Sequence, residues 1–304
     1  MFLKKYFRKL GALGIASALI AGVIAYKEHQ DSVFYQRSLP VLKTGGLQEV
    51  MGLFKQGLSA TTKDNTGSTP IFKVSQYNIN PTVARAVARK TRHKKVVNKK
   101  GYTPLMLASS RNVVGVVKAL VQEGFPVNTQ ARNGLSALML AAKNNPHVEV
   151  AQFLLTQGAD VRQKTDQGMN ALHYAVLRRT LEIAKSLLEA GAEVNATDRG
   201  GRTALIWTVL KGENPKMVDL LMKQGAQINQ ADAHGKTALM YALSMPGKEA
   251  YALELLKFNP DLFYEDSEGK NALDYAKRNY KLPKNVYTEL NQAVKKIKRK
   301  NTSY

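Results

Sequence analysis

The sequence predicts an all-α fold: a solenoid of stacked helix–turn–helix units with β-hairpin loops, preceded by an N-terminal hydrophobic helix. The first observation is a glycine that returns at an almost constant interval, at Gly67, Gly101, Gly134, Gly168, Gly201, Gly235 and Gly269. The second is a parallel series in step with it, at Gly124, Gly158, Gly191 and Gly225, with Asn259 in the next slot. The third is an uncharged apolar run, from Leu10 to Tyr26, ahead of the repeats. A fixed period between roughly 20 and 50 residues indicates a repeat architecture.

Each position of the repeat suits one local structure. The first glycine, as at Gly201, is suited to a tight turn with positive φ. Two residues later a hydroxyl such as Thr203 can cap a helix, and proline or alanine follows at the first helical position. The second glycine, as at Gly225, ends the second helix after the apolar pair Leu221 and Met222. One unit cannot bury its apolar face alone, so the units must stack.

The repeat resembles the ankyrin-repeat signature, which has a period of about 33 residues and opens its first helix with T-P-L-H-x-A. The best copies are TPLMLA at residues 103–108 and NALHYA at residues 170–175, and the resemblance covers residues 33–300. It implies a non-catalytic module whose partners contact the hairpin tips and the exposed positions of the first helices, which line a concave face. It also implies a structural hydrogen bond between repeats for His173, which alone keeps the histidine of the motif.

The sequence divides into four parts. Residues 1–30 are expected to form a signal peptide or a signal-anchor helix, and residues 31–63 a degenerate N-terminal capping repeat. Residues 64–283 hold the ankyrin-like repeats, and residues 284–304 a C-terminal capping helix with a basic tail. Both ends are polar or basic enough to cap a solenoid, whose terminal faces cannot be left apolar.

The N-terminal segment predicts export. Lys4, Lys5, Arg8 and Lys9 precede the apolar run, which is the order of a secretory signal. As a helix the run is about 25 Å long, which is shorter than a hydrocarbon core of about 30 Å but within the range that a spanning helix tolerates. A cleaved signal and an uncleaved inner-membrane anchor therefore both stay open. The excess of basic residues before the run places the rest of the chain on the periplasmic side. The alternative is a cytosolic effector or adaptor whose N-terminal run is not a translocation signal.

Charge and motif content narrow the function classes. The chain has a formal net charge of +22 and no cysteine. Residues 1–122 hold 20 Lys/Arg against 4 Asp/Glu, residues 123–276 hold 16 against 18, and residues 277–304 hold 9 against 1. Such a balance favours anionic partners. Gly-rich phosphate loops, H-E-x-x-H and G-x-S-x-G are absent, so the sequence predicts no enzyme, no cofactor, no metal site and no small-molecule substrate.

The predicted partner surface is basic with aromatic and apolar interruptions, a composition similar to that of protein interfaces. Its candidates lie at hairpin tips, after turn glycines and at the ends of first helices: Lys99, Lys100, Tyr102, Arg111, Arg132, Asn133, Leu135, Lys143, Met169, Arg178, Arg199, Arg202, Lys211, His234 and Lys236. We expect an acidic protein partner and a monomeric chain. The competing interpretation is a solvated basic face, with Leu135 packed against the next repeat. Trp207 and Tyr241 are expected in the core.

Two basic runs suggest an alternative function, electrostatic docking to an anionic membrane or envelope polymer. The candidates in the first run are Arg85, Arg89, Lys90, Arg92, Lys94 and Lys95, and those in the tail are Lys295, Lys296, Lys298, Arg299 and Lys300. A solvated, highly charged face explains the same runs. Nucleic acid is a minor hypothesis, because stacking aromatics are sparse there and no nucleic-acid-binding motif accompanies the runs.

Overall fold

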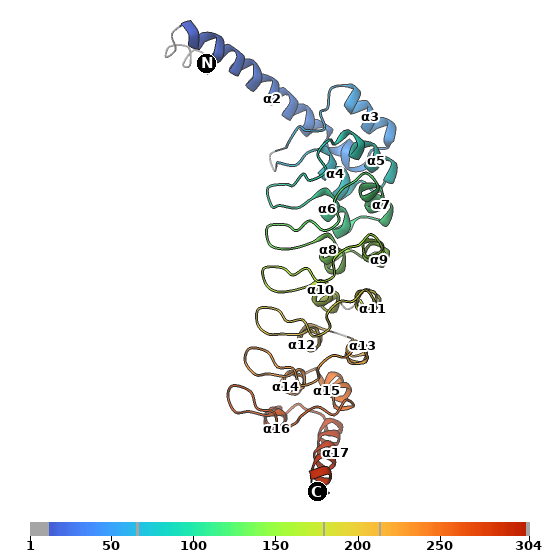
Figure 1. Cartoon of the computed structure of the whole chain (residues 1–304), viewed down its shortest axis with the longest axis vertical. Helices are drawn as coiled ribbons and strands as arrows, with labels where there is room; N and C mark the ends of the chain where they lie inside the picture. Colours follow the sequence, from blue (N-terminus) through green and yellow to red (C-terminus); the bar gives the residue numbers. More distant parts are fainter. Residues whose placement is uncertain (1–11, 65–66, 179, 213, 302–304) are drawn as a thin grey trace. The chain divides into compact units, whose positions relative to one another are not determined.

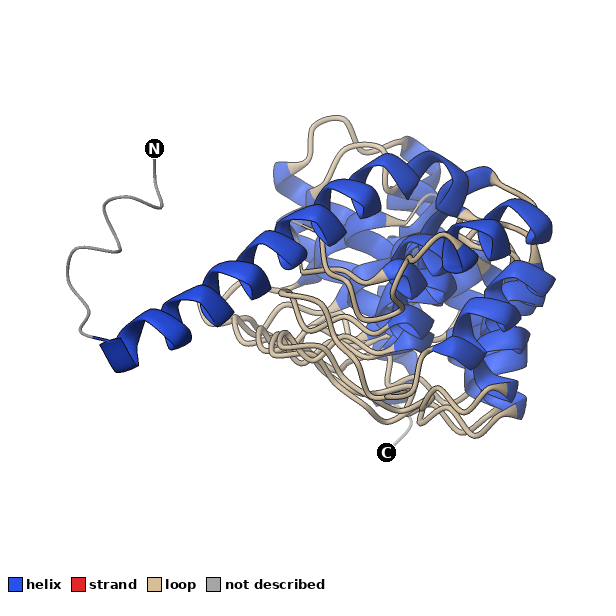
Figure 2. Ribbon diagram, turned by 90° about the horizontal axis from the view of Figure 1, so that it is seen from above, coloured by secondary structure: helices blue, strands red, loops and turns tan. Residues whose placement is uncertain are grey.

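The computed structural model describes residues 12–64, 67–178, 180–212 and 214–301. Within these ranges every regular element is a helix, apart from two isolated antiparallel bridges, Gln130 with Ser136 and Thr197 with Thr203. Figure 2 draws helices and loops alone for this part of the chain. The predicted all-α class is therefore confirmed, and the hairpins are loops rather than strands.

The first of two compact units comprises Met1–Ala108 and Asn112–Pro126. Its helices are α2 (Ala12–Thr44), α3 (Leu47–Lys55), α4 (Pro70–Tyr77), α5 (Pro81–Lys90), most of α6 (Pro104–Arg111) and α7 (Val114–Gln122). Helix α5 packs between α3 and α7, and α2 packs on α4. The core contains large side chains such as Phe72 and Phe125, which are almost fully buried.

Helix α2 is one continuous helix of 33 residues, which crosses the boundary expected at residue 30. Its C-terminal part buries Tyr35 and Leu42, whereas Val23, Ile24 and Tyr26 are exposed. The basic residues of the expected signal, in residues 1–11, lie outside the described residues. No helix in the described part of the chain combines the length and the apolarity of a membrane span.

The second unit comprises Ser109–Arg111 and Val127–Tyr304. In Figure 1 the first helices of its repeats follow one another in a row, beside the hairpin loops: α8 (Ala137–Asn144), α10 (Ala171–Arg178), α12 (Ala204–Lys211), α14 (Ala238–Ser244) and α16 (Ala272–Arg278). The second helices form a parallel row: α9 (Val148–Thr156), α11 (Leu181–Glu189), α13 (Lys216–Lys223), α15 (Glu249–Leu256) and the terminal α17 (Lys284–Asn301). Each first helix packs on the next, so the apolar faces form a continuous core.

Local chemistry explains why the helices begin and end where they do. The hydroxyl of Thr203 accepts a hydrogen bond from the backbone nitrogen of Ile206 and caps α12, as the sequence predicts. The turn glycine Gly201 has φ +74°, and the second-series glycine Gly225 has φ +84°. Asn259 occupies the glycine slot at φ 50° and is the only non-glycine residue with positive φ among the described residues.

Buried asparagines at the ends of first helices join neighbouring repeats. In the second unit, Asn145 donates from Nδ2 to the carbonyl oxygen of Ser109 at 2.9 Å, and Asn279 donates to that of Leu243 at 2.8 Å. Asn112 makes the same kind of bond in the first unit. These contacts satisfy carbonyl groups that a helix leaves unpaired at its C-terminal end.

His173 links two repeats inside the second unit. It is fully buried, and its Nε2 lies 3.2 Å from the carbonyl oxygen of Arg202 in the following repeat. Its Nδ1 lies beside Asn170, the residue that precedes α10. Burial lowers the pKa of His173, so the ring is neutral and serves as a structural hydrogen-bonding group. The contact is of the inter-repeat kind that the resemblance implied.

Candidate functional site

The structure leaves most of the predicted partner residues on the surface. In the second unit the exposed ones are Arg111, Arg132, Asn133, Lys143, Arg178, Arg199, Lys211 and His234, and the partly exposed ones are Met169, Arg202 and Lys236. In the first unit Lys99 and Lys100 are exposed and Tyr102 is partly exposed. Leu135 is different: only 5% of its surface is exposed, so it belongs to the core and cannot contribute a side chain to a partner contact.

Asp198 joins a hairpin, a cation and an aromatic ring in the repeat that contains α12. Its buried carboxylate accepts hydrogen bonds from the backbone nitrogens of Gly200 (2.8 Å) and Arg202 (2.9 Å). It also accepts from the Arg202 guanidinium (2.9 Å) and from the indole nitrogen of Trp207 (3.0 Å). Burial alone would raise the pKa of Asp198, but these donors outweigh burial and lower it, so the carboxylate is ionised.

The next two repeats build the same arrangement with tyrosine. The carboxylate of Asp232 accepts hydrogen bonds from two backbone nitrogens of its hairpin and from the Tyr241 hydroxyl at 2.6 Å. Asp266 accepts the hydroxyl of Tyr275 in the same way. Burial, and then the bond to Asp232, raises the pKa of Tyr241, so its hydroxyl stays protonated and donates. Each of the three carboxylates is buried and is bonded within its own repeat.

Cations lie over the rings of these repeats. The guanidinium carbon of Arg202 is 4.2 Å from the centre of the Trp207 ring, and the Nζ of Lys236 is 5.2 Å from that of Tyr275. The Nζ of Lys143 is 5.2 Å from the ring centre of Tyr174. Such contacts stabilise a positive charge on a partly exposed surface by about 0.5–1 kcal/mol each.

We call Tyr174, Trp207, Tyr241 and Tyr275 the aromatic row. Each is the fourth residue of a first helix, α10, α12, α14 or α16. Tyr174 is the most buried, with 8% of its surface exposed, and the other three are partly exposed. The expectation of a core position is therefore wrong for Trp207 and Tyr241, which are bonded to the hairpins. Sequence reasoning missed the row, although a signal existed: an aspartate stands nine residues before the aromatic residue in three successive repeats.

Three of the six predicted residues of the first basic run bond to other groups of the first unit. Arg89 pairs with Glu123 at 2.9 Å, and Arg85 donates to the side chain of Gln122 at 2.7 Å. Lys94 donates to the carbonyl oxygen of Ala88, at the C-terminal end of α5. The remaining predicted residues of the run are exposed: Lys90, Arg92 and Lys95. These contacts favour a structural role for Arg85, Arg89 and Lys94.

The basic C-terminal tail is the last part of α17. Lys295, Lys296 and Arg299 are exposed, and Lys296 donates to the side chain of Asn259 at 2.9 Å. The side chains of Lys298 and Lys300 lie outside the described residues. The bond to Asn259 joins the tail to the loop that follows α15, so we treat the tail as a feature separate from the aromatic row.

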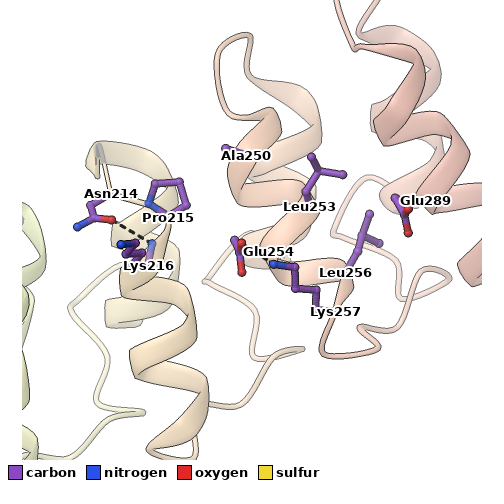
Figure 3. A pocket seen from close by; sticks show the side chains of 9 residues that line it. All are labelled: Asn214, Pro215, Lys216, Ala250, Leu253, Glu254, Leu256, Lys257 and Glu289. Carbon is purple, nitrogen blue, oxygen red and sulfur yellow. Dashed lines mark hydrogen bonds and ion pairs between the residues drawn. The ribbon is translucent and has the colours of Figure 1, made fainter.

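A cleft of about 650 Å³ lies in the second unit between the start of α13, α15 and α17 (Figure 3). Leu253, Leu256 and Pro215 supply apolar walls, and Glu254 pairs with Lys257 at 2.6 Å. Its charged groups are neutralised or exposed, and none of its lining residues is a nucleophile of the serine or cysteine type. Among the described residues, no three His, Asp or Glu side chains meet as metal ligands.

Comparison with known proteins gives a consistent family. A family model described as ankyrin repeats (3 copies) matches residues 110–198 and 197–266. An ankyrin repeat-containing protein of Treponema pallidum (strain Nichols) is 31% identical over 144 residues, which is 47% of this chain and 48% of the relative. An ankyrin repeat protein of fowlpox virus (strain NVSL) is 39% identical over 75 residues, 24% of this chain and 22% of the relative.

A rat protein with ankyrin repeats and a SAM domain is 36% identical over 86 residues, which is 28% of this chain and 10% of the relative. The chain therefore matches less than half the length of each of these three relatives. Repeats of this kind indicate a protein–protein interaction module, because their stack presents an extended binding surface.

Proposed function

Because the chain belongs to the ankyrin-repeat family, we propose that it is a non-catalytic module that binds an acidic protein partner through the hairpins and first helices of its second unit. The observation that carries the proposal is the aromatic row with its cations. Arg202 and Lys236 lie over aromatic rings, and the aspartates bonded to the rings, Asp198, Asp232 and Asp266, are bonded within their own repeats. Aromatic residues and arginine are the side chains that contribute most to protein interfaces.

Two exposed arginines at hairpin tips of the second unit support the sign of the partner. Arg132 and Arg199 are exposed at two turns, and the exceptions at other turns are Asp166 and Glu268. Glu268 is itself paired with Lys270. Exposed arginines speed the encounter with an acidic protein and select against a basic one.

Two exposed arginines provide the test. Photo-cross-linking at the hairpin tips of the full chain, followed by purification of the captured protein, supplies a partner whose dissociation constant can be measured. We expect Arg132→Glu with Arg199→Glu to weaken that complex by about 10- to 100-fold, because each reversal places like charges across the interface. Arg202 is left unchanged, because its pairing with Asp198 supports the fold.

The matched control reverses two charges on second helices. Lys185→Glu with Lys223→Glu changes the net charge by the same amount, at residues whose side chains are 66% and 68% exposed. The control should bind as the unmodified chain does. Equal weakening by both double variants, or capture of a basic partner, contradicts the proposed surface.

We also propose that the repeats act on the exported side of a membrane, either tethered by the N-terminal segment or released from it. The support is the order of basic residues and apolar run between Met1 and Tyr26. A C-terminally tagged chain should appear in the periplasmic or membrane fraction, with the tag open to added protease in spheroplasts. Recovery of the tag in the cytosol, protected from protease, would leave the cytosolic adaptor as the correct alternative.

A further inference from the structure

The aromatic row has a regular spacing that restricts what can lie along it. Its four residues occupy the same position in α10, α12, α14 and α16, and each of these helices packs on the next. Neighbouring packed helices lie about 8–10 Å apart, so the rings recur at about that interval. A ligand that uses every ring must therefore present an equivalent group at the same interval.

Cations accompany the rings along the row. Arg202 lies over Trp207, and its charge also reaches the Tyr241 hydroxyl. Lys236 lies over Tyr275, and Lys143 lies over Tyr174. Because Lys270 is paired with Glu268, the positive charge at Tyr275, the last ring of the row, comes from Lys236. Trp207, Tyr241 and Tyr275 thus offer partly exposed rings near a positive charge, whereas the position of the buried Tyr174 offers Lys143 alone. Together they fit carboxylates carried on an apolar backbone.

Among regular extended conformations, polyproline II matches this spacing. It rises about 3.1 Å per residue with three residues per turn, so residues i, i+3 and i+6 share one face at intervals of about 9.3 Å. A β-strand covers a similar distance in three residues, but its side chains alternate, so residues i and i+3 point to opposite faces. Polyproline II also exposes an apolar surface that aromatic side chains bind without a large loss of conformational entropy.

We propose that the aromatic row binds an acidic polyproline II segment of the partner, with one carboxylate at every third residue placed against successive positions of the row. This proposal rests on the proposed function and deepens it by naming the conformation and the charge spacing of the bound segment. Four positions correspond to four acidic residues, or a segment of about 12 residues.

Trp207 provides a direct reporter, because it is the only tryptophan of the chain and lies within the row. The full chain is titrated with the peptide (Pro-Pro-Glu)4, and the fluorescence of Trp207 is followed. We expect a saturable change in intensity and a binding constant that weakens with salt. The neutral peptide (Pro-Pro-Gln)4 should bind at least tenfold more weakly, because it lacks the carboxylates.

Two further peptides test the conformation. The flexible peptide (Gly-Ser-Glu)4 keeps the charge and its spacing in sequence but lacks a preformed helix, and should bind at least tenfold more weakly. In an α-helical peptide with glutamate at every seventh residue, the glutamates recur on one face at intervals of about 10.5 Å. This spacing is close to that of the row, so the helical peptide is the most demanding comparison. If either binds as tightly as (Pro-Pro-Glu)4, the polyproline II assignment is wrong, while the acidic-partner proposal stands.

Variants place the peptide on the row. Lys143→Gln with Lys236→Gln removes two cations that face rings, and should weaken (Pro-Pro-Glu)4 at least tenfold. Lys185→Gln with Lys223→Gln removes the same charge from second helices and should leave binding unchanged. Equal effects of the two pairs, or no change in Trp207 fluorescence at any peptide concentration, overturns the inference. The cross-linked partner and the Arg132 and Arg199 reversals then still test the proposed function independently.

Discussion

Replacement of Gly201 by alanine should lower the free energy of unfolding by about 2–5 kcal/mol, through backbone strain and through steric contact with the next hairpin. Gly201 has φ +74°, where an L-residue costs about 1–2 kcal/mol. A Cβ atom at this position would also lie 2.7 Å from the backbone nitrogen of Ala233 and 3.0 Å from the carbonyl carbon of Asp232. Both belong to the next hairpin, whose backbone cannot move aside without breaking the bond from Ala233 to the carbonyl oxygen of Gly200.

Gly191 provides a control that separates strain from contact. It has φ +86°, yet a Cβ atom there would meet nothing within 4 Å. Gly191→Ala should therefore cost only the conformational part, about 1–2 kcal/mol. Urea denaturation of both variants, followed by circular dichroism, compares the two at the same residue change. If the two midpoints shift equally, neighbouring hairpins do not pack as closely as the structure places them.

The repeats were predictable because each one solves the same local problem with the same residues. Gly201 and Thr203 specify a turn and a cap by their own chemistry, and their return at an almost constant interval reveals the stack without any tertiary information. The same logic identifies His173 through its place in the motif. Features that depend on a single residue type and its immediate neighbours are visible in the sequence.

The aromatic row was not predictable in the same way. Trp207 follows the apolar pair Leu205 and Ile206, so sequence alone favours a core position for it. Its partial exposure depends on a hairpin that folds back and brings Asp198 within 3.0 Å of the indole nitrogen. Helix α2 shows a related difficulty: residues 1–30 are expected as a separate segment, but the helix continues through residue 30 to Thr44.

The buried asparagines between repeats lead to a second large effect. Asn145 is 2% exposed, donates from Nδ2 to the carbonyl oxygen of Ser109 at 2.9 Å and accepts from the backbone nitrogen of His147 at 2.9 Å. Asn145→Ala removes both partners where water has no access. A buried group left without a hydrogen bond costs about 1–3 kcal/mol, so we expect a loss of about 2–4 kcal/mol in the free energy of unfolding.

Asn128 makes the same two bonds at the surface of the same unit. Its Nδ2 donates to the carbonyl oxygen of Gly158 at 2.9 Å, and its Oδ1 accepts from the backbone nitrogen of Asp160 at 2.9 Å. Because it is exposed, water replaces the lost partners in Asn128→Ala, and the loss should be about 0.5–1 kcal/mol. A comparison of the urea denaturation midpoints of the two variants therefore isolates burial as the cause of the larger loss of stability. Equal losses would mean that water reaches the end of α8, in which case the first helices do not form the closed core on which the aromatic row depends.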